Sequence, residues 1–284
     1  MEWKQYDSAR LLLDKAGDLL ERDEAANSLL LGLLDTLARQ ENSGPLATAP
    51  LVASVDDDRG RPVLVLLLNA INLIVYGNGP EQAQAVRVAV SHLVRWNRHV
   101  PGLVGSVEVA RQFAEEWAEA AGKTAVVKMN QRVHRLDAVN PVRISPGRLQ
   151  LAGEDDAALI AGWVHEFAES VGERMTAEEA KTRTREAIAG STLFLWTDAG
   201  KAVSMAKKTR PTRSGIALSL VYTPSELRGK GYATSCVAAL SQRMLDEGRQ
   251  FCCLYTDLSN PISNGIYAKI GYKPVQDSIQ YRFN

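Results

Sequence analysis

The sequence predicts an α/β protein made of two halves that share one order of secondary-structure elements. Its 284 residues are long for one compact domain and comfortable for two domains of about 140 residues, each able to bury a core. Hydrophobic periodicity gives each half two helices and three strands, followed by a helix, a strand, a helix and a strand. In the second half, a glycine-rich basic turn joins a strand to a helix, as in many α/β proteins.

Apolar spacing places the elements of the first half. Leucine-rich stripes predict helices over 11–20 and 29–37, and the run Asn42-Ser43-Gly44-Pro45 predicts the loop that follows. The other predicted elements are strands over 51–55, 63–68 and 72–76, a helix over 81–96, a strand at 103–104, a helix over 107–121 and a strand over 124–128. Asp56, Asp57 and Asp58 have no partner His or Cys, so we expect a solvated hairpin and no metal site.

The second half begins near Val142, after the turn signal Asn140-Pro141. Thr176 and Glu179 form a capping box that opens the second of its two helices. The predicted elements are a strand over 148–151, helices beginning near 156 and 177, a hairpin over 192–207, a strand over 216–222, a helix from 233, a strand over 251–256 and a helix over 261–270.

The turn Arg228-Gly229-Lys230-Gly231-Tyr232-Ala233 has the chemistry of an anion-binding site. It follows a strand and opens a helix, where backbone N–H groups and the helix dipole favour negative charge. Gly229 and Gly231 carry no side chain that would block a phosphate, and Arg228 and Lys230 add positive charge. An ordinary exposed basic loop is the alternative.

A second cluster, Asn260 to Tyr272, predicts a short helix near the C-terminus. Asn260 is a good N-cap, Pro261 suits the first helical position, and Gly271 suits the C-terminal end. Ile262, Ile266 and Ile270 predict one buried stripe, so we expect Tyr267 at a partly buried edge beside that stripe.

Together the two clusters resemble the GCN5-related N-acetyltransferases (GNAT). The acetyl-CoA motif of that family is Gln/Arg-x-x-Gly-x-Gly/Ala, matched here by Arg228, Gly231 and Ala233. Its later motif, an Asn followed by a Tyr and then by Gly-Phe or Gly-Tyr, is matched by Asn260, Tyr267 and Gly271-Tyr272. The resemblance covers about residues 142–284, and the whole chain is similar to predicted bacterial acetyltransferases with a divergent N-terminal half.

The resemblance implies a tandem fold with a mixed central sheet flanked by helices. We expect a divergent first domain over residues 1–140 and a catalytic domain over 141–284. The first copy is expected to be degenerate, because its turn Tyr76-Gly77-Asn78-Gly79-Pro80-Glu81 has no basic residue and Pro80 lacks an N–H.

The resemblance also implies residues for the acetyl donor, acetyl-CoA. The strand end is expected to pair with the pantetheine arm and the basic turn to hold the pyrophosphate. The residues expected to bind the donor are Leu220, Val221, Tyr222, Arg228, Gly229, Lys230, Gly231, Tyr232, Ala233, Thr234, Asn260 and Ser263.

The implied reaction is direct transfer of acetyl to a primary amine. Tyr267 occupies the family's position for protonating the leaving thiolate; a packing role is the alternative. The acceptor-site candidates are Trp163, Glu166, Glu169 and Asp257. The alternative for Trp163 is a core position, and for Glu166 and Glu169 an ordinary solvent-facing position on the helix. The strand 216–222 lacks the acid or histidine that often serves as base, which leaves Glu166, Glu169, Asp257 and ordered water open.

Composition constrains the setting of this chemistry. Lys plus Arg and Asp plus Glu balance at 33 each, which favours neither nucleic acid nor an anionic membrane as a partner. The three cysteines and the lack of an apolar N-terminal segment indicate a cytoplasmic protein, and the apolar block 63–76 is too short to span a bilayer. The acceptor stays open among antibiotics, polyamines, amino acids and peptide amines.

Two function classes remain after this reasoning. The chain is an acetyltransferase acting on a small-molecule or peptide amine, or a non-catalytic acetyl-CoA-binding sensor or assembly module. The N-terminal half is expected either to shape the acceptor site or to form a subunit interface, as in a homodimer.

Overall fold

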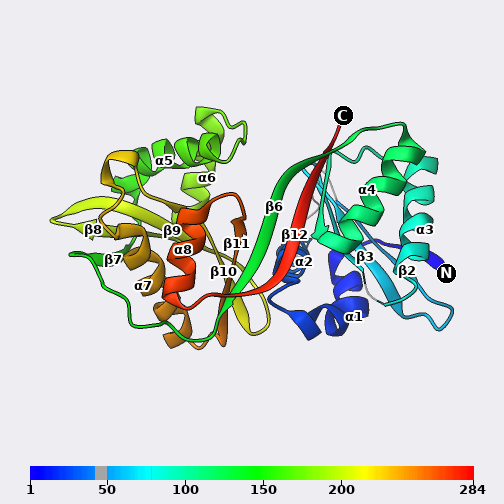
Figure 1. Ribbon diagram of the computed structural model, residues 1–284, viewed down its shortest axis with the longest axis horizontal. Helices are drawn as coiled ribbons and strands as arrows, with labels where there is room; N and C mark the ends of the chain where they lie inside the picture. Colours follow the sequence, from blue (N-terminus) through cyan, green and yellow to red (C-terminus); the bar gives the residue numbers. More distant parts are fainter. Residues whose placement is uncertain (42–49, 78) are drawn as a thin grey trace.

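The structure is a computed structural model that describes residues 1–41, 50–77 and 79–284. Its described strands form one continuous 12-stranded sheet in the order β1-β2-β3-β4-β5-β12-β6-β11-β10-β9-β8-β7. Helices lie on both faces of this mixed sheet, and the two halves of the chain lie side by side (Figure 1). The predicted loop at Asn42–Pro45, and Asn78 in the first glycine turn, lie outside the described residues.

The first half has the predicted order of elements, with one additional strand at its start. Sequence periodicity gave no sign of β1, which pairs antiparallel with β2 through Glu2–Tyr6. The elements are β1 (Glu2–Tyr6), α1 (Ala9–Leu20), α2 (Ser28–Glu41), β2 (Leu51–Asp56), β3 (Pro62–Leu68), β4 (Leu73–Gly77), α3 (Gln82–Arg95), β5 (Gly102–Ser106), α4 (Val107–Ala121) and β6 (Ala125–Leu136).

The second half repeats this order. Its elements are β7 (Arg148–Leu151), α5 (Ala157–Ser170), α6 (Ala177–Ala189), β8 (Leu193–Asp198), β9 (Lys201–Pro211), β10 (Gly215–Tyr222), α7 (Tyr232–Asp246), β11 (Phe251–Asp257), α8 (Pro261–Ile270) and β12 (Lys273–Phe283). The capping box at Thr176 is present, with the Thr176 hydroxyl accepting from the Glu179 N–H at 3.2 Å.

Each half buries one apolar layer on each face of the sheet. In the first half, α3 and α4 cover one layer, whereas α1 and α2 cover the other. In the second half, α7 and α8 pack on one face, whereas α5 and α6 pack on the other. Burial of these stripes from both faces is the main source of stability in such a fold.

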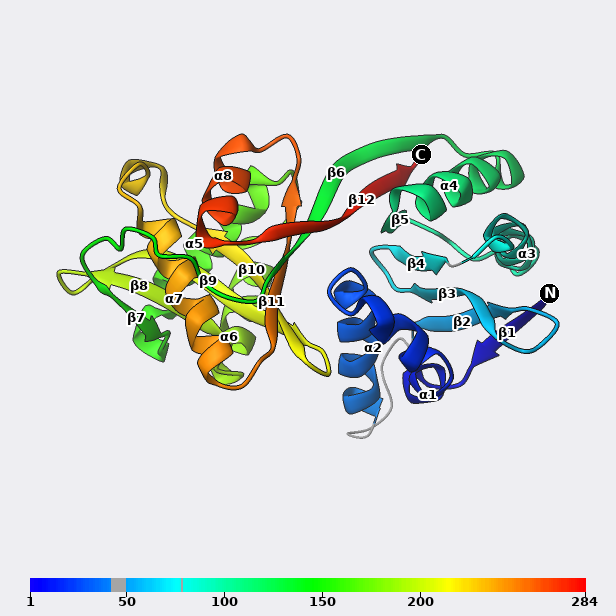
Figure 2. The ribbon, with the colours of Figure 1, turned by 60° about the horizontal axis from the view of Figure 1, so that its bottom comes forward.

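The last strands of the two halves are exchanged. Strand β6 leaves the first half and pairs antiparallel with β11, through Leu136↔Cys252 to Gln131↔Asp257. Strand β12 returns from the second half and pairs with β5, through Ser278↔Ser106 to Arg282↔Gly102. The two strands also pair with each other along their length and form the long ribbon that joins the halves (Figure 2). Each half of the sheet is therefore completed by a strand from the other half.

The halves also meet where α2 approaches the hairpin of β9 and β10. A Cβ added to Gly32, inside α2, would lie 2.4 Å from the Cβ of Arg210. Glycine inside a helix costs about 1 kcal/mol relative to alanine. The close approach of Arg210 explains why glycine stands at this position.

Two local expectations are wrong. Ile262 is 76% exposed, so the buried stripe of α8 consists of Tyr267 and Ile270, with Ile266 partly buried. The first turn of this short helix extends beyond the core. The hairpin at Asp56–Asp58 is present, yet Asp56 is buried near Lys4 at 3.2 Å and Asp57 accepts hydrogen bonds from Arg61, so only Asp58 is a solvated carboxylate.

Candidate active site

The central strands of the second half diverge at one end. Parallel pairing of β10 and β11 runs from Gly215↔Phe251 to Ala217↔Cys253 and then stops. Both strands continue, to Tyr222 and Asp257 respectively. Backbone groups beyond Ala217 on β10 therefore have no partner on β11, and they can pair with an extended ligand instead.

A β-bulge lies on β10 at the opening. The register with β9 shifts between Ser219 and Tyr222, and Leu220 has a φ of +51°. A positive φ at a branched residue is uncommon and costs of order 1–3 kcal/mol, and such strain clusters at functional sites. The bulge turns the backbone of Leu220 and Val221 out of the regular ladder, at two of the positions predicted to contact the acyl donor.

The basic turn has the backbone geometry that an anion cradle requires. Gly229 and Gly231 have φ values of +77° and +82°, which glycine adopts without penalty. Gly231 is the N-cap of α7 and has no side chain to bond the first-turn N–H groups, so the N–H donors of the first turn stay available for an anion. A Cβ added to Gly229 would meet no atom within 4 Å, so the turn is open on that side.

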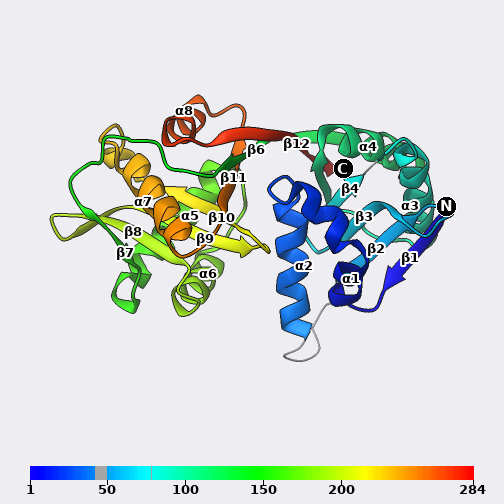
Figure 3. The ribbon, with the colours of Figure 1, turned by 90° about the horizontal axis from the view of Figure 1, so that it is seen from below.

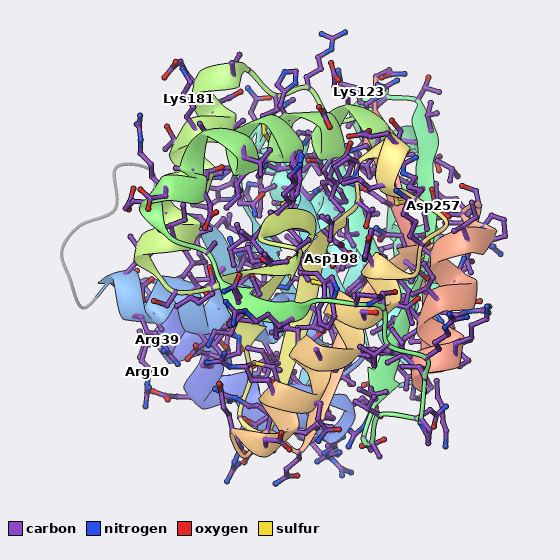
Figure 4. The ribbon with its side chains drawn as sticks, turned by 90° about the vertical axis from the view of Figure 1, so that its left-hand side faces the viewer. Arg10, Arg39, Lys123, Lys181, Asp198 and Asp257 are labelled. Atoms are coloured by element: carbon purple, nitrogen blue, oxygen red, sulfur yellow. The ribbon has the colours of Figure 1, made fainter. Side chains whose placement is uncertain are left out.

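The basic residues of the turn differ in placement. Arg228 is exposed and folds back, donating from Nε to the Thr223 carbonyl at 3.0 Å, with its guanidinium 5.9 Å from the centre of the Tyr222 ring. Lys230 is exposed, and its carbonyl accepts a bond from Ser145. Tyr232, the first residue of α7, donates its hydroxyl to Asp198 at 2.7 Å. In Figure 4, Asp198 lies on the face of the molecule that is turned to the viewer.

The segment between the halves runs over the cradle, which sequence reasoning did not anticipate. The Ser145 hydroxyl donates to the Lys230 carbonyl at 2.7 Å, and the Ser145 N–H donates to the Ser235 hydroxyl at 2.8 Å. A Cβ added to Gly231 would lie 2.7 Å from the Ser145 Oγ. Gly231 is therefore required for contact with this segment as well as for its positive φ. No local pattern around Ser145 signals this role.

Helix α8 brings Tyr267 to the core beneath the diverging strands. The Asn260 side chain accepts from the Ser263 N–H at 3.1 Å, and Gly271 ends the helix at a φ of +113°. Asn260, a residue predicted to bind the acyl donor, thus caps α8, and Ser263, another such residue, lies in the first turn of the helix. Asn264 donates to the Asp257 carbonyl at 2.9 Å, and its own buried Oδ1 has no partner among the described residues. No sequence pattern singles out this polar atom.

Tyr267 is more buried than predicted. It is 8% exposed, and its ring packs edge-on against Tyr272 with centroids 5.8 Å apart. It shares its core cluster with Leu218 and Leu254, the residues at which β10 and β11 part. Burial and the nearby Cys236 raise the pKa of Tyr267. In the described part of the chain its hydroxyl has no hydrogen-bond partner, and it is not among the polar atoms fully sealed from solvent.

On the opposite face, the structure brings together two predicted residues, Tyr222 and Glu166. The Tyr222 hydroxyl donates to Glu166 Oε2 at 2.6 Å. Burial, followed by this hydrogen bond, raises the pKa of Tyr222 to about 12, so the phenol stays protonated. Glu166 reaches the end of β10 from α5 and is the acceptor-site candidate nearest the bulge.

The other acceptor candidates occupy different positions. Trp163 is buried, and its ring lies 6.3 Å from that of Tyr222, so it packs in the core beneath this face. Glu169 lies near His165 on the surface of α5, with 4.0 Å between Oε1 and Nδ1. Asp257 uses Oδ1 to accept from the N–H and hydroxyl of Ser259, on the side of the molecule that carries α8 (Figure 4).

The cysteines are poorly suited to nucleophilic chemistry. All three, Cys236, Cys252 and Cys253, are buried and free of disulfides. Burial raises the pKa of Cys236 and Cys252 to about 12 and also raises that of Cys253. The thiolate form is therefore disfavoured at neutral pH.

The first half has a corresponding opening without the same chemistry. Pairing of β4 with β5 stops after Ile74↔Val104, and a cavity of about 60 Å³ lies at this point. Gln82 closes the following turn: a Cβ added to Gly77 would lie 2.5 Å from the Gln82 Oε1, and Gln82 donates to Gln112 at 2.8 Å. Tyr255, from β11, also lines this cavity.

Comparisons with known proteins show which fold this chain shares. Residues 198–281 match the family model described as FR47-like protein. A GCN5-related N-acetyltransferase from Sphaerobacter thermophilus superposes with a TM-score of 0.65 at 16% identity, over 99% of this chain and 94% of that chain. An acetyltransferase of the GNAT family from Colwellia psychrerythraea gives a TM-score of 0.59 at 14% identity, over 100% of both chains.

A tandem GNAT protein from the clavulanic acid biosynthesis pathway gives a TM-score of 0.54 at 15% identity, over 99% of this chain and 97% of that chain. No curated protein matches the sequence. In the described part of the chain, none of the helices has the length and apolar character needed to cross a bilayer. The predicted resemblance is confirmed: this chain has the tandem fold of the GNAT acetyltransferases, and residues 198–281 of its second half match the FR47-like model.

Proposed function

We propose that this protein transfers an acetyl group from acetyl-CoA to a primary amine, by direct transfer within a ternary complex. The observation that carries the proposal is the junction at the end of β10. There, the bulge at Leu220, the loss of pairing with β11 and the glycine turn before α7 lie within one short stretch of chain. Unpaired backbone groups and an anion cradle suit a ligand that has an amide-bearing arm and a pyrophosphate.

The residues present fit coenzyme A. Gly229, Gly231 and the N–H groups at the start of α7 would hold the pyrophosphate, supported by the charges of Arg228 and Lys230. The backbone of Leu220 and Val221 would hold the pantetheine arm. When bound, acetyl-CoA supplies the acyl group as a reactive thioester. In our proposal the catalytic site lies in the second predicted domain, residues 141–284.

The amine must lose a proton before it can attack, because a free alkylamine has a pKa of about 10.4. Among the candidates, we assign this role to Glu166, directly or through water, because its carboxylate lies beside the end of β10 and is bonded to Tyr222. We assign protonation of the departing sulfur to Tyr267. Its raised pKa keeps the phenol protonated, and its hydroxyl is free of other bonds within the described residues.

We propose that the first half shapes the acceptor side of this site. The Tyr255 hydroxyl donates to the Ala26 carbonyl at 3.3 Å, and the Ser214 N–H donates to Glu24 at 2.6 Å. Both contacts place the α1–α2 connection over the face of β10 and β11 that Glu166 also borders.

Thiol release from acetyl-CoA, measured with a panel of primary amines, tests the activity. Mass spectrometry of products formed in a cell extract then identifies the acceptor. Calorimetry is expected to give one acetyl-CoA per chain, because Gln82 closes the turn of the first half. Binding without thiol release would favour a sensor or assembly module, and two sites per chain would contradict the degenerate first copy.

A further inference from the structure

We infer that the acceptor side of the site contains a carboxylate-binding subsite, formed by Lys207 and Arg210 of β9. The acceptor would then be an amine that also carries an acidic group, such as an amino acid or a peptide. This inference rests on the proposed acyl transfer and specifies its acceptor.

Strand geometry places Lys207 on the acceptor face of the sheet. Lys207 pairs with Ser219 on β10, directly before the bulge. Its charge interacts with Glu186 and Arg183 of α6, the helix that covers this face. Lys208, the next residue, points to the opposite face, where its ammonium lies 5.7 Å from the centre of the Phe194 ring.

Arg210 reaches the same face from a strained position. Its φ is +44°, and it lies at a register shift between β9 and β10. The positive charge of Arg210 lowers the pKa of Lys207 on one side of β10 and opposes the rise in the pKa of Tyr255 on the other side. The side chain leaves β9 on the face that α2 covers, because a Cβ added to Gly32 of α2 would lie 2.4 Å from the Arg210 Cβ. Figure 3 shows this end of β9 beside α2, with α6 on the same side of the sheet.

Neither cation is neutralised by a direct contact in the described part of the chain. Within the described residues, neither side chain forms an ion pair or a hydrogen bond, and the Nε of Arg210 is buried without an acceptor. Burial is the largest effect on the pKa of Lys207 and lowers it, and the charges of Arg210 and Arg183 lower it further. The negative charge of Glu186 raises the pKa, but by less than burial lowers it. A buried donor without a partner is costly, so an anionic ligand would relieve an existing penalty.

The position fits an acceptor that spans the subsite and the bulge. Leu220 follows Ser219 directly, so the two cations lie within about 10 Å of the bulge along the strand. Of the amines left open by the sequence, amino acids and peptides carry a carboxylate, whereas a polyamine would bring further positive charge to a cationic site. The structure thus favours acidic amines over polyamines.

Paired acceptors test the inference. L-Lysine and cadaverine differ only in the carboxylate, so kcat/KM for acetylation should be at least about tenfold higher for L-lysine. Lys207→Met and Arg210→Gln should lower kcat/KM for L-lysine about tenfold, mainly through KM, with a much smaller effect on cadaverine. Lys208→Met is the matched control, because it removes the same charge from the other face, and it should behave as wild type. Equal use of both amines by the wild type would overturn the subsite while leaving acyl transfer intact.

Binding of glutarate, measured by calorimetry without any amine, gives a readout independent of turnover. Wild type and Lys208→Met should bind glutarate, and Lys207→Met should bind it about tenfold more weakly. Glutarate binding without acetylation of either amine would support the subsite and count against the proposed reaction. Absence of binding to the wild type, or equal binding by the Lys207 variant, would refute the subsite.

Discussion

Replacing Tyr267 with phenylalanine removes one oxygen atom and retains the buried ring. The ring packs edge-on against Tyr272 and is 8% exposed, so Tyr267→Phe keeps nearly all of its apolar contacts. The hydroxyl forms no hydrogen bond within the described residues. Its removal therefore breaks no bond in the folded protein, and the free energy of unfolding should change by less than about 1 kcal/mol.

The catalytic effect should be larger. A positioned general acid contributes about 10²–10⁴-fold to a rate, and the thiolate of coenzyme A, with a pKa near that of cysteine at ~8.5, is a modest leaving group. We therefore expect kcat to fall about 100-fold, which corresponds to about 2.7 kcal/mol in the activation free energy. The KM for acetyl-CoA should change little, because the hydroxyl acts in the chemical step.

Steady-state thiol release, acetyl-CoA calorimetry and urea unfolding measure these three quantities. Tyr272→Phe is a matched control, because the Tyr272 hydroxyl bonds the Ser241 hydroxyl at 2.8 Å in the core. Losing this buried bond should cost about 1–3 kcal/mol of stability with kcat near wild type. Wild-type turnover by Tyr267→Phe would show that Tyr267 serves packing alone and would refute its assignment as the acid.

Three further predictions follow from the cradle, the cysteines and the exchanged strands. Gly229→Ala should weaken acetyl-CoA binding, since its Cβ enters the open side of the turn, and its only stability cost should be the backbone strain at a φ of +77°. Gly231→Val should destabilise the fold further by displacing Ser145. Equal acetyl-CoA affinity in Gly229→Ala and wild type would contradict the cradle. Replacing all three cysteines with Ala or Ser should leave turnover within a few fold if the protein folds, and a trapped acyl-enzyme in the wild type would refute direct transfer. Burial lowers the pKa of His134, on β6, so the unfolded chain binds this proton more readily, and stability should be complete above about pH 6.5 and fall as the pH decreases below it. Urea unfolding at pH 7.5 and 5.5 should show a smaller fall for His134→Gln than for wild type, and identical falls would assign the effect to other groups.

Much of the fold could be predicted from local patterns. The helices and strands lie close to their predicted positions, since amphipathic spacing, caps and glycine turns act over a few residues. Local patterns also predicted the glycine turn at Gly229 and Gly231 and the N-cap at Asn260, because the residues that form each of these features are contiguous in the sequence. The burial of Ile262 could not be predicted in this way, because periodicity specifies a helix face and not how far the core extends along it.

The exchange of β6 and β12 was decided by tertiary structure alone. Each of the two strands pairs with a neighbour along both edges, and strand pairing is specified by register and burial over distances that no local window contains. Gly32 is a related case, since its requirement comes from Arg210, which is far away in the chain.

Lys207 and Lys208 show most clearly where sequence information ends. The two residues are chemically identical and adjacent, and alternation along a strand determines only that they face opposite sides. Which of them meets α6 and which lies over Phe194 depends on how the helices pack on the sheet. The sequence by itself determined the glycine-rich turn that we propose binds acyl-CoA, because its residues are contiguous, whereas the proposed acceptor side, assembled from β9, α5, α6 and α2, was decided only when the chain folded.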